Sequence, residues 1–212
     1  MVRVYAADIS MLKDPKVCPD ILNGLAEYRQ NKIKAFHNSK GRIESFGAGI
    51  LLQKVLSRHG KSDREITIGV HGKPELSGLY FNLSHSDTIC LCVVSEKKVG
   101  CDIEKIKTAP QKLAKRFFHK NEIQYLETLD SKEQNLTFYR LWTIKESYLK
   151  MTGDGLSYPL KEFEVRFADD IKIYKGTKVQ NCYVKEYYIS GFKVSVCAKE
   201  NIFDNTIEFI QL

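Results

Sequence analysis

Residues 89–104 read ICLCVVSEKKVGCDIE and are the most clearly patterned part of the chain. The longest uninterrupted apolar run, residues 89–94, opens this segment and is typical of a buried strand. Three charged residues, 96–98, follow as a turn, and a second strand is expected over residues 99–104. We therefore predict a β-hairpin here. The apolar run is far shorter than the roughly 20 residues that a membrane-spanning helix needs.

Helices and strands are predicted on both sides of this hairpin in the same order. Before it, the pattern predicts a strand over 2–6, helices over 19–36 and 41–58, and strands over 66–70 and 79–83. After it, the pattern predicts helices over 110–118, 121–129 and 131–151, and strands over 163–167, 182–189, 192–198 and 206–210. This order predicts an α+β fold of two similar halves, each of helices and an antiparallel sheet, with the cleft between them. The boundary is expected after residue 104, between an N-terminal half (1–104) and a C-terminal half (105–212).

The formal net charge of the 212-residue chain is +7, and its distribution is uneven. The segment between residues 29 and 73 has ten basic and three acidic residues, so it accounts for the whole net charge. Such a segment favours an anionic partner, whether nucleic acid, a phosphorylated small molecule or an acidic protein; the alternative is a solvated basic helix face. The six cysteines include no C-x-x-C pair, which argues against disulfides and zinc. Because the start of the chain has no basic segment followed by an apolar core, we expect a cytoplasmic protein.

Asp102 and Glu104 form a pair of carboxylates at the end of the second strand of the predicted hairpin. Residues two apart on a strand project to the same face, so these side chains lie together and Ile103 faces the other way. Neighbouring carboxylates raise each other's pKa unless a cation neutralises them. A hard divalent ion such as Mg²⁺ prefers such oxygen ligands. The alternative is a charged strand end that faces solvent.

Residues 142–150, WTIKESYLK, place a further carboxylate and a lysine on a predicted helix. Trp142, Glu146 and Lys150 are spaced four apart and share one face. Glu146 could complete a metal and phosphate site, or it could form a purely local ion pair with Lys150 while Trp142 lies in the core. The spacing of Ser131 and Gln134 predicts a capping box at the start of this helix.

Residues 82–87, NLSHSD, end a predicted strand with small polar side chains and a histidine. The hydroxyls and the imidazole can donate to a phosphate, or they can cap backbone groups in a turn. The segment has no G-x-S-x-G elbow, which disfavours a serine hydrolase. Just upstream, residues 72–74, GKP, add a lysine on a stiff turn.

Taken together, the segments NLSHS (82–86), GCDIE (100–104) and WTIKESYLK (142–150) resemble the three signature blocks of the 4′-phosphopantetheinyl transferases. Their order and separations agree with the family, GKP at 72–74 is similar too, and the resemblance covers residues 29–165. The length and the repeated order of elements resemble the longer, pseudo-dimeric surfactin-synthetase-activating (Sfp-type) group rather than the short holo-acyl-carrier-protein synthases. The resemblance implies a pseudo-duplicated fold with the active site between its halves, and we expect a monomer.

The resemblance also implies an activity and roles for individual residues. The family transfers the 4′-phosphopantetheine arm of coenzyme A to a serine of a carrier protein and releases adenosine 3′,5′-bisphosphate. By resemblance, Asp102, Glu104 and Glu146 hold Mg²⁺, with Mn²⁺ as an alternative, on the coenzyme A pyrophosphate. Glu146 is the implied base, directly or through a water, and Lys150 steadies the phosphate that gains charge. The residues implied to contact coenzyme A are Lys73, Pro74, Ser84, His85, Arg29, Lys32, Arg42 and Ser45.

Two further regions resemble family segments. The aromatic residues of Phe117-Phe118-x-x-x-Glu122 are expected in the core, with Glu122 as a helix-start carboxylate. Lys145 is expected to have a structural role or to contact the carrier, and residues 121–129 are a candidate docking surface. The implied partners are acidic acyl or peptidyl carrier proteins of fatty-acid, polyketide or peptide synthetases. The choice of carrier and the tolerance of acyl-CoA stay open.

Other functions fit the residues less well. A nucleic-acid-binding module needs aromatic side chains among its basic ones, but residues 29–73 contain only Phe36 and Phe46, both at helix-core spacing. A family member that binds without turnover is disfavoured because the three carboxylates and Lys150 are all present. We therefore expect neither a nucleic-acid nor a membrane partner.

Overall fold

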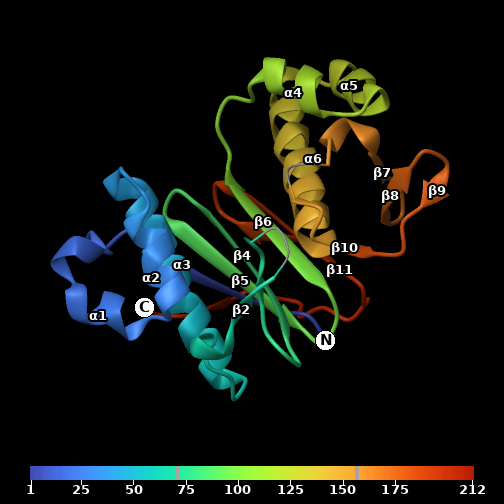
Figure 1. Cartoon of the computed structure of the whole chain (residues 1–212). Helices are drawn as coiled ribbons and strands as arrows, with labels where there is room; N and C mark the ends of the chain where they lie inside the picture. Colours follow the sequence, from blue (N-terminus) through green and yellow to red (C-terminus); the bar gives the residue numbers. More distant parts are fainter. Residues whose placement is uncertain (70–71, 156–157) are drawn as a thin grey trace.

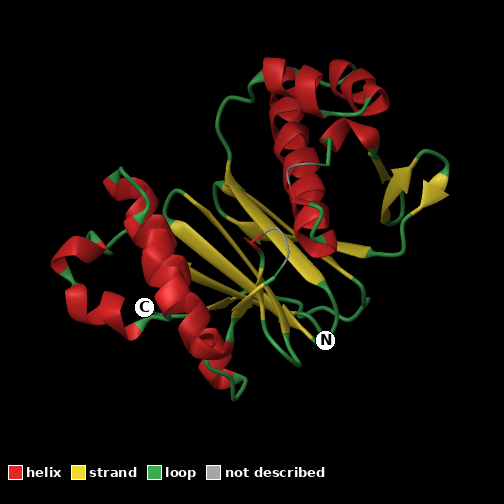
Figure 2. Cartoon of the chain, in the orientation of Figure 1, coloured by secondary structure: helices red, strands yellow, loops and turns green. Residues whose placement is uncertain are grey.

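The computed structural model, which describes residues 1–69, 72–155 and 158–212, contains two main β-sheets and two long helices (Figures 1 and 2). The first sheet has the order β12-β1-β5-β4, formed by β1 (Arg3–Asp8), β4 (Tyr80–Ser86), β5 (Ile89–Ser95) and β12 (Glu208–Phe209). Its neighbours are antiparallel except for β12, which is parallel to β1. The long helix α3 (Ser39–Arg58) lies against this sheet, preceded by α1 (Pro19–Gly24) and α2 (Glu27–Lys34).

The second sheet is antiparallel and has the order β10-β11-β6, formed by β6 (Val99–Lys105), β10 (Tyr183–Ile189) and β11 (Phe192–Ala198). The long helix α6 (Ser131–Thr152) lies against it, preceded by α4 (Gln111–Phe117) and α5 (Lys120–Glu127). Two small sheets complete the described strands: β2 (Thr67–Ile68) with β3 (Pro74–Glu75), and β7 (Glu164–Phe167) with β8 (Ile171–Lys175) and β9 (Lys178–Val179).

The two halves repeat the same plan, which confirms the predicted α+β fold of two similar halves. In the first, β5 lies between β1 and β4, and α3 follows β1. In the second, β11 lies between β6 and β10, and α6 follows β6. The predicted boundary after residue 104 places β6 in the N-terminal half. In the structure β6 belongs to the second sheet. As a hydrogen-bonded unit, the second half begins at Val99.

The predicted hairpin between residues 88–94 and 99–104 is wrong, although both strands exist. Strand β5 pairs with β4 across the turn at Asp87 and Thr88, and Asp87 has the positive φ (55°) that such a short turn requires. The other edge of β5 is occupied by β1. Because neither edge of β5 is free, the charged residues 96–98 lead β6 across to β11 instead.

In the described residues the core has three apolar layers, one beneath each long helix and one between the sheets, and a smaller cluster among α1, α2 and α3. Successive side chains of β5 point to opposite faces of the sheet. Cys90 and Cys92 therefore lie beneath α3, whereas Leu91 and Val93 lie in the shared layer between the sheets. Strand β6 contributes Cys101, Val99 and Ile103 to the shared layer. Its other face, which carries Asp102 and Glu104, therefore points toward α6.

Two local predictions also differ from the structure. The helix expected over 19–36 is divided into α1 and α2, because Leu25 and Ala26 are extended and the Ala26 amide donates to Asp63 Oδ2 at 2.9 Å. The capping box of Ser131 and Gln134 is wrong: the N-cap of α6 is Asp130, whose carboxylate accepts the amides of Lys132 and Glu133. None of the helices in the described residues is long and apolar enough to cross a lipid bilayer.

Candidate active site

Asp102 and Lys150 are brought together because α6 packs unusually close to β6. A Cβ atom on Gly100 would lie 2.2 Å from the carbonyl oxygen of Ser147 and 2.3 Å from the amide nitrogen of Met151, so only glycine allows the helix backbone to approach the strand. At this distance, Lys150 Nζ lies 2.7 Å from Asp102 Oδ1 and 3.1 Å from Ser84 Oγ. The predicted local pair of Glu146 and Lys150 is thus replaced by a tertiary ion pair.

Glu146 and Glu104 lie close enough to Asp102 for the three carboxylates to influence one another. Burial, and then the charge of Asp102, raises the pKa of Glu146 to about 7, while Lys150 acts in the opposite direction. Burial and Asp102 also raise the pKa of Glu104, against a hydrogen bond from Ser86. The structure therefore gathers the three predicted carboxylates into one group with excess negative charge.

The carboxylate group fits a divalent cation that takes part of its ligands from a substrate. Asp102 is 4% exposed, and its Oδ2 atom has no hydrogen-bond partner among the described residues. A buried carboxylate oxygen without a donor is costly unless a cation or water satisfies it. No three His, Cys, Asp or Glu side chains of residues 1–69, 72–155 and 158–212 are already arranged to hold a metal ion. The protein's own carboxylates would therefore be completed by phosphate oxygens or waters.

A cluster of basic side chains borders the carboxylates. Burial and the charges of Lys150, Lys32 and Arg29 lower the pKa of His85 to about 4. The same positive neighbours, Arg29 and Lys150, add to burial in lowering the pKa of Lys32. Arg29 is 5% exposed, and its Nε atom has no partner in the described part of the chain. This arrangement is typical of a site for a multiply charged anion.

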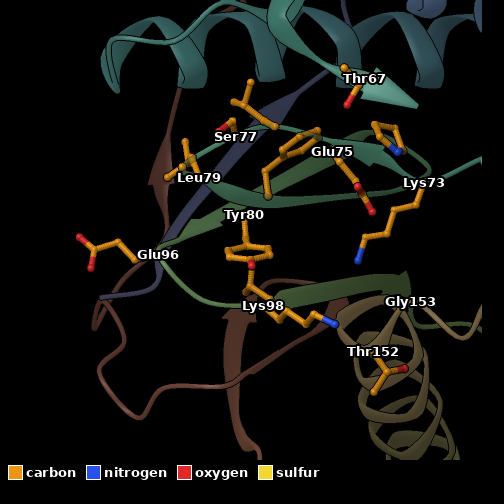
Figure 3. Close-up of a pocket in the computed structure, with 15 residues that line it drawn as sticks. Thr67, Lys73, Glu75, Ser77, Leu79, Tyr80, Glu96, Lys98, Thr152 and Gly153 are labelled. Carbon is orange, nitrogen blue, oxygen red and sulfur yellow. The ribbon is translucent and has the colours of Figure 1, made fainter. Parts of the chain in front are cut away.

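Lys73 and Pro74 lie at the rim of a cavity of about 680 Å³ between β3, β4 and the end of α6. Figure 3 shows the Lys73 side chain reaching toward α6 near Thr152 and Gly153. Lys73 Nζ donates to the carbonyl oxygen of Lys150 at 2.7 Å, so this lysine links the two halves directly behind the Lys150 side chain. The cavity contains none of the three carboxylates and adjoins them through this link.

A second hollow, of about 540 Å³, opens beside Glu146. Its walls are mainly apolar and include Trp142, Phe117, Tyr158 and Leu160. Trp142 packs against the ring of Phe117, with ring centroids 5.7 Å apart, and also against the buried rings of Phe118 and Phe138, so it is partly buried at the edge of the core. Glu146 therefore lines this hollow as well as belonging to the carboxylate group.

Arg42 and Ser45 are not brought to the carboxylates by any described contact. Arg42 Nη2 lies 2.6 Å from Asp14 Oδ2, its Nε donates to the same carboxylate, and its Nη1 donates to the carbonyls of Phe36 and His37. Ser45 is 1% exposed, and its Oγ has no hydrogen-bond partner among the described residues. In this structure the Arg42 guanidinium is saturated by the protein itself.

Lys145, expected to be structural or to contact a carrier, is completely buried. Its Nζ lies 2.9 Å from Glu122 Oε1 and donates to the carbonyl oxygens of Leu160 and Phe163. Glu122 also forms the predicted helix-start interaction, as it accepts the His119 amide at 2.8 Å. Lys145 therefore has a structural role.

Two side chains of the NLSHSD segment have contacts with β6 that the sequence analysis did not assign. Asn82 and Ser86 both contact β6, Asn82 through the Cys101 amide and Ser86 through Glu104 and the Lys105 amide. The signal was present in the sequence, because positions 82, 84 and 86 alternate along a strand and therefore share one face.

Comparisons with known proteins agree with one another. The sequence model of the 4′-phosphopantetheinyl transferase superfamily matches residues 98–197. The chain is 35% identical over 191 residues to 4′-phosphopantetheinyl transferase Sfp of Bacillus subtilis (strain 168), covering 86% of this chain and 85% of the relative. It is 31% identical over 204 residues to 4′-phosphopantetheinyl transferase gsp of Aneurinibacillus migulanus, covering 93% and 86%.

Similar solved structures include a holo-(acyl-carrier-protein) synthase from Bacillus anthracis str. Ames in complex with CoA (3′,5′-ADP). It is 19% identical with a TM-score of 0.41, and the match covers 48% of this chain and 93% of that one. The holo-[acyl-carrier-protein] synthase of Thermotoga maritima is 18% identical with a TM-score of 0.42, and the match covers 50% of this chain and 64% of that one.

Proposed function

The chain belongs to the 4′-phosphopantetheinyl transferase superfamily as a relative of the Sfp-type enzymes, and from this we propose the reaction that its site performs. The protein transfers the 4′-phosphopantetheine group of coenzyme A to a serine hydroxyl of an acyl or peptidyl carrier protein. The reaction releases adenosine 3′,5′-bisphosphate. The observation that carries the proposal is the Asp102 Oδ2 atom, which has no partner in the described part of the chain and lies near Glu104, Glu146 and the Lys150 ammonium.

For this reaction the protein must accept one proton from the serine hydroxyl and stabilise the negative charge that develops on the phosphate. The serine oxygen forms a bond to the β-phosphorus of coenzyme A, and the bond from that phosphorus to the bridging oxygen breaks. Glu146, whose pKa is raised to about 7, accepts the serine proton directly or through a water. Lys150, fixed by Asp102 and Ser84, faces the phosphate that gains charge.

Asp102, Glu104 and Glu146 are the residues that would hold Mg²⁺, with Mn²⁺ as the alternative. When bound, the ion neutralises the pyrophosphate and orients it for in-line attack. Burial first, and then the charge of Asp102, raise the pKa values of Glu104 and Glu146, so a cation would offset part of the repulsion among the three carboxylates. Metal dependence is therefore expected from the charges of the protein itself.

The basic cluster accounts for the binding of coenzyme A. Arg29, Lys32 and His85 lie near Lys150 and would pair with the phosphates, while Lys73 and Pro74 contribute from the rim of the neighbouring cavity. The N-terminal half thus supplies most of the phosphate-binding groups. The C-terminal half supplies Glu146, Lys150 and the surface for the carrier. A net charge of +7 suits an acidic carrier, and the cleft within one chain suits a monomer.

Intact-protein mass spectrometry tests the proposal. An apo carrier protein is incubated with coenzyme A, Mg²⁺ and either the wild type, Asp102→Ala or Glu146→Ala; Glu133→Ala, an exposed change on the same helix, is the control. The carrier should gain one phosphopantetheine with the wild type and the control, and the rate should fall about a hundredfold or more with the site variants and with EDTA. If fatty-acid, polyketide and peptidyl carriers all remain unmodified and calorimetry detects no coenzyme A binding, the proposed function is wrong.

A further inference from the structure

The two halves meet along β4 and β6, and side chains rather than backbone groups connect these strands. Both are edge strands of their sheets, and no strand ladder joins them. Instead, side chains of β4 accept every second amide of β6. Asn82 Oδ1 accepts the Cys101 amide at 3.0 Å, Ser84 Oγ the Ile103 amide at 3.4 Å, and Ser86 Oγ the Lys105 amide at 3.0 Å. We call this row of three side chains the β4–β6 seam; the two strands lie side by side in Figure 1.

The two serines of the seam repeat one hydrogen-bond pattern two residues apart. Ser84 accepts the Ile103 amide and donates to Asp102 Oδ1 at 2.8 Å. Ser86 accepts the Lys105 amide and donates to Glu104 Oε2 at 3.0 Å. In each case the serine binds a carboxylate and the amide of the residue that follows it. A hydroxyl has one donor and two acceptor positions. Because each serine oxygen accepts the backbone amide, its hydrogen is left to donate to the carboxylate.

This pattern holds one oxygen of each carboxylate and leaves the second oxygen for another partner. For Asp102 the second oxygen is Oδ2, which is buried and has no partner among the described residues. Ser84 also accepts from Lys150 Nζ at 3.1 Å, so the same hydroxyl orients the ammonium and the carboxylate. Asp102 and Glu104, which would hold the cation, are thus oriented by serines of β4, which belongs to the other half of the molecule.

We propose that Ser84 and Ser86 are positioning residues that orient Asp102 and Glu104 for a divalent cation, an inference that rests on the proposed function. Ser84 then acts on the site through Asp102 and Lys150. The seam couples cation binding to the junction of the halves, because the carboxylates keep their orientation only while β4 and β6 stay in register. Asn82 belongs to the seam but contacts no carboxylate, so it supports the junction alone.

The experiment measures Mg²⁺ binding to the full-length protein by isothermal titration calorimetry with saturating coenzyme A. The variants are Ser84→Ala, Ser86→Ala, Ser86→Thr and Asn82→Ala, each also examined by thermal unfolding. Loss of a hydrogen bond to a metal ligand typically weakens metal affinity about ten- to a hundredfold, and we expect this for both serine-to-alanine variants. Ser86→Thr keeps the hydroxyl and should restore affinity. Asn82→Ala should lower the midpoint of thermal unfolding without changing Mg²⁺ affinity.

The outcomes separate this inference from the proposed function. If the wild type binds Mg²⁺ and transfers phosphopantetheine while Ser86→Ala binds Mg²⁺ within twofold of it, the positioning role is wrong and the function stands. Equal weakening by Asn82→Ala also overturns the role, because the effect would then belong to the seam as a whole. A wild type that binds neither Mg²⁺ nor Mn²⁺ overturns the positioning role, whereas the function is decided separately by the transfer assay. If Ser84→Ala does not fold, the half-buried Ser86 still decides the question, since it does not contact Lys150.

Discussion

The ammonium of Lys145 lies 2.9 Å from Glu122 Oε1, and the two side chains are 0% and 2% exposed. The pair joins α6 to α5, and the Lys145 contacts with Leu160 and Phe163 extend it to the segment before β7. Burial raises the pKa of Glu122, and Lys145 opposes that shift. Because the residue after Lys145 is the proposed base, this buried pair anchors the part of α6 that carries the site.

Replacing Lys145 with methionine should therefore destabilise the whole protein. Breaking a buried ion pair typically costs about 3–5 kcal/mol, because the remaining charge has no counterion. Urea unfolding should show this loss for Lys145→Met, and adding Glu122→Gln should recover part of it, because the uncompensated charge is then removed. Lys172→Met, which breaks an exposed pair with Asp170, should change the free energy of unfolding by about 1 kcal/mol or less. A similarly small change for Lys145→Met would contradict the anchoring role.

Gly100→Ala should separate β6 from α6. Its new methyl group would fall within 2.3 Å of backbone atoms of Ser147 and Met151, which cannot move away as side chains can. Overpacking of this kind costs about 1–3 kcal/mol or more, and it should also displace Lys150 from Asp102. Thermal unfolding and transfer activity should both decrease. Gly24→Ala, where a Cβ would meet nothing within 4 Å, is the matched control. Retention of both properties in Gly100→Ala would disprove the close approach.

Arg42 and Lys32 should respond differently to substitution. Since Arg42 is held by Asp14 and two carbonyl groups, Arg42→Lys should lower the midpoint of thermal unfolding and leave the KM for coenzyme A within about twofold. Lys32→Ala should do the reverse, because its ammonium lies near the charges of Arg29 and Lys150, where a phosphate would relieve their repulsion. Steady-state kinetics together with thermal unfolding distinguish the two. A large rise in KM for Arg42→Lys would instead support the sequence-based assignment of this residue to coenzyme A.

His85 should make the protein less stable as the solution becomes acidic. Burial and the neighbouring cations lower its pKa to about 4, whereas an unfolded histidine has a pKa of about 6.5. Between these values the unfolded chain binds a proton that the folded chain rejects, so the free energy of unfolding decreases as the pH falls. Urea unfolding at several pH values should show a shallower decrease for His85→Asn. His37→Asn, at an exposed histidine, is the control.

Direct NMR titration provides an independent measurement of the same property. The His85 imidazole should titrate near pH 4 in the free protein. Coenzyme A should raise this pKa, because its phosphates offset the charges of Lys150, Lys32 and Arg29. An imidazole that titrates near 6.5 in the free protein would show that the cations do not dominate its surroundings, where Glu44 Oε2 also lies 3.5 Å from His85 Nδ1.

Much of the site follows from short-range periodicity. Alternation along residues 99–104 is enough to place Asp102 and Glu104 on one face, and a spacing of four is enough to place Glu146 and Lys150 on one side of a helix. Both expectations agree with the structure, in which the three carboxylates influence one another and Lys150 contacts Asp102. The gap in the helix at Leu25 and Ala26 was not predictable in this way, because the Asp63 carboxylate that stabilises it comes from a distant part of the chain.

The sequence by itself determined which face the site residues share on β6 and on α6, the main order of helices and strands apart from the short strands β3, β8 and β9, and the chemical class of the site. These properties depend on backbone geometry that repeats every two or every 3.6 residues. Only the tertiary structure decided which elements become neighbours: β6 with β11 rather than β5, Arg42 with Asp14, and Ser84 with Asp102. Such pairings depend on which strand edges and buried charges remain unsatisfied once the rest of the chain has folded, and no local period encodes that.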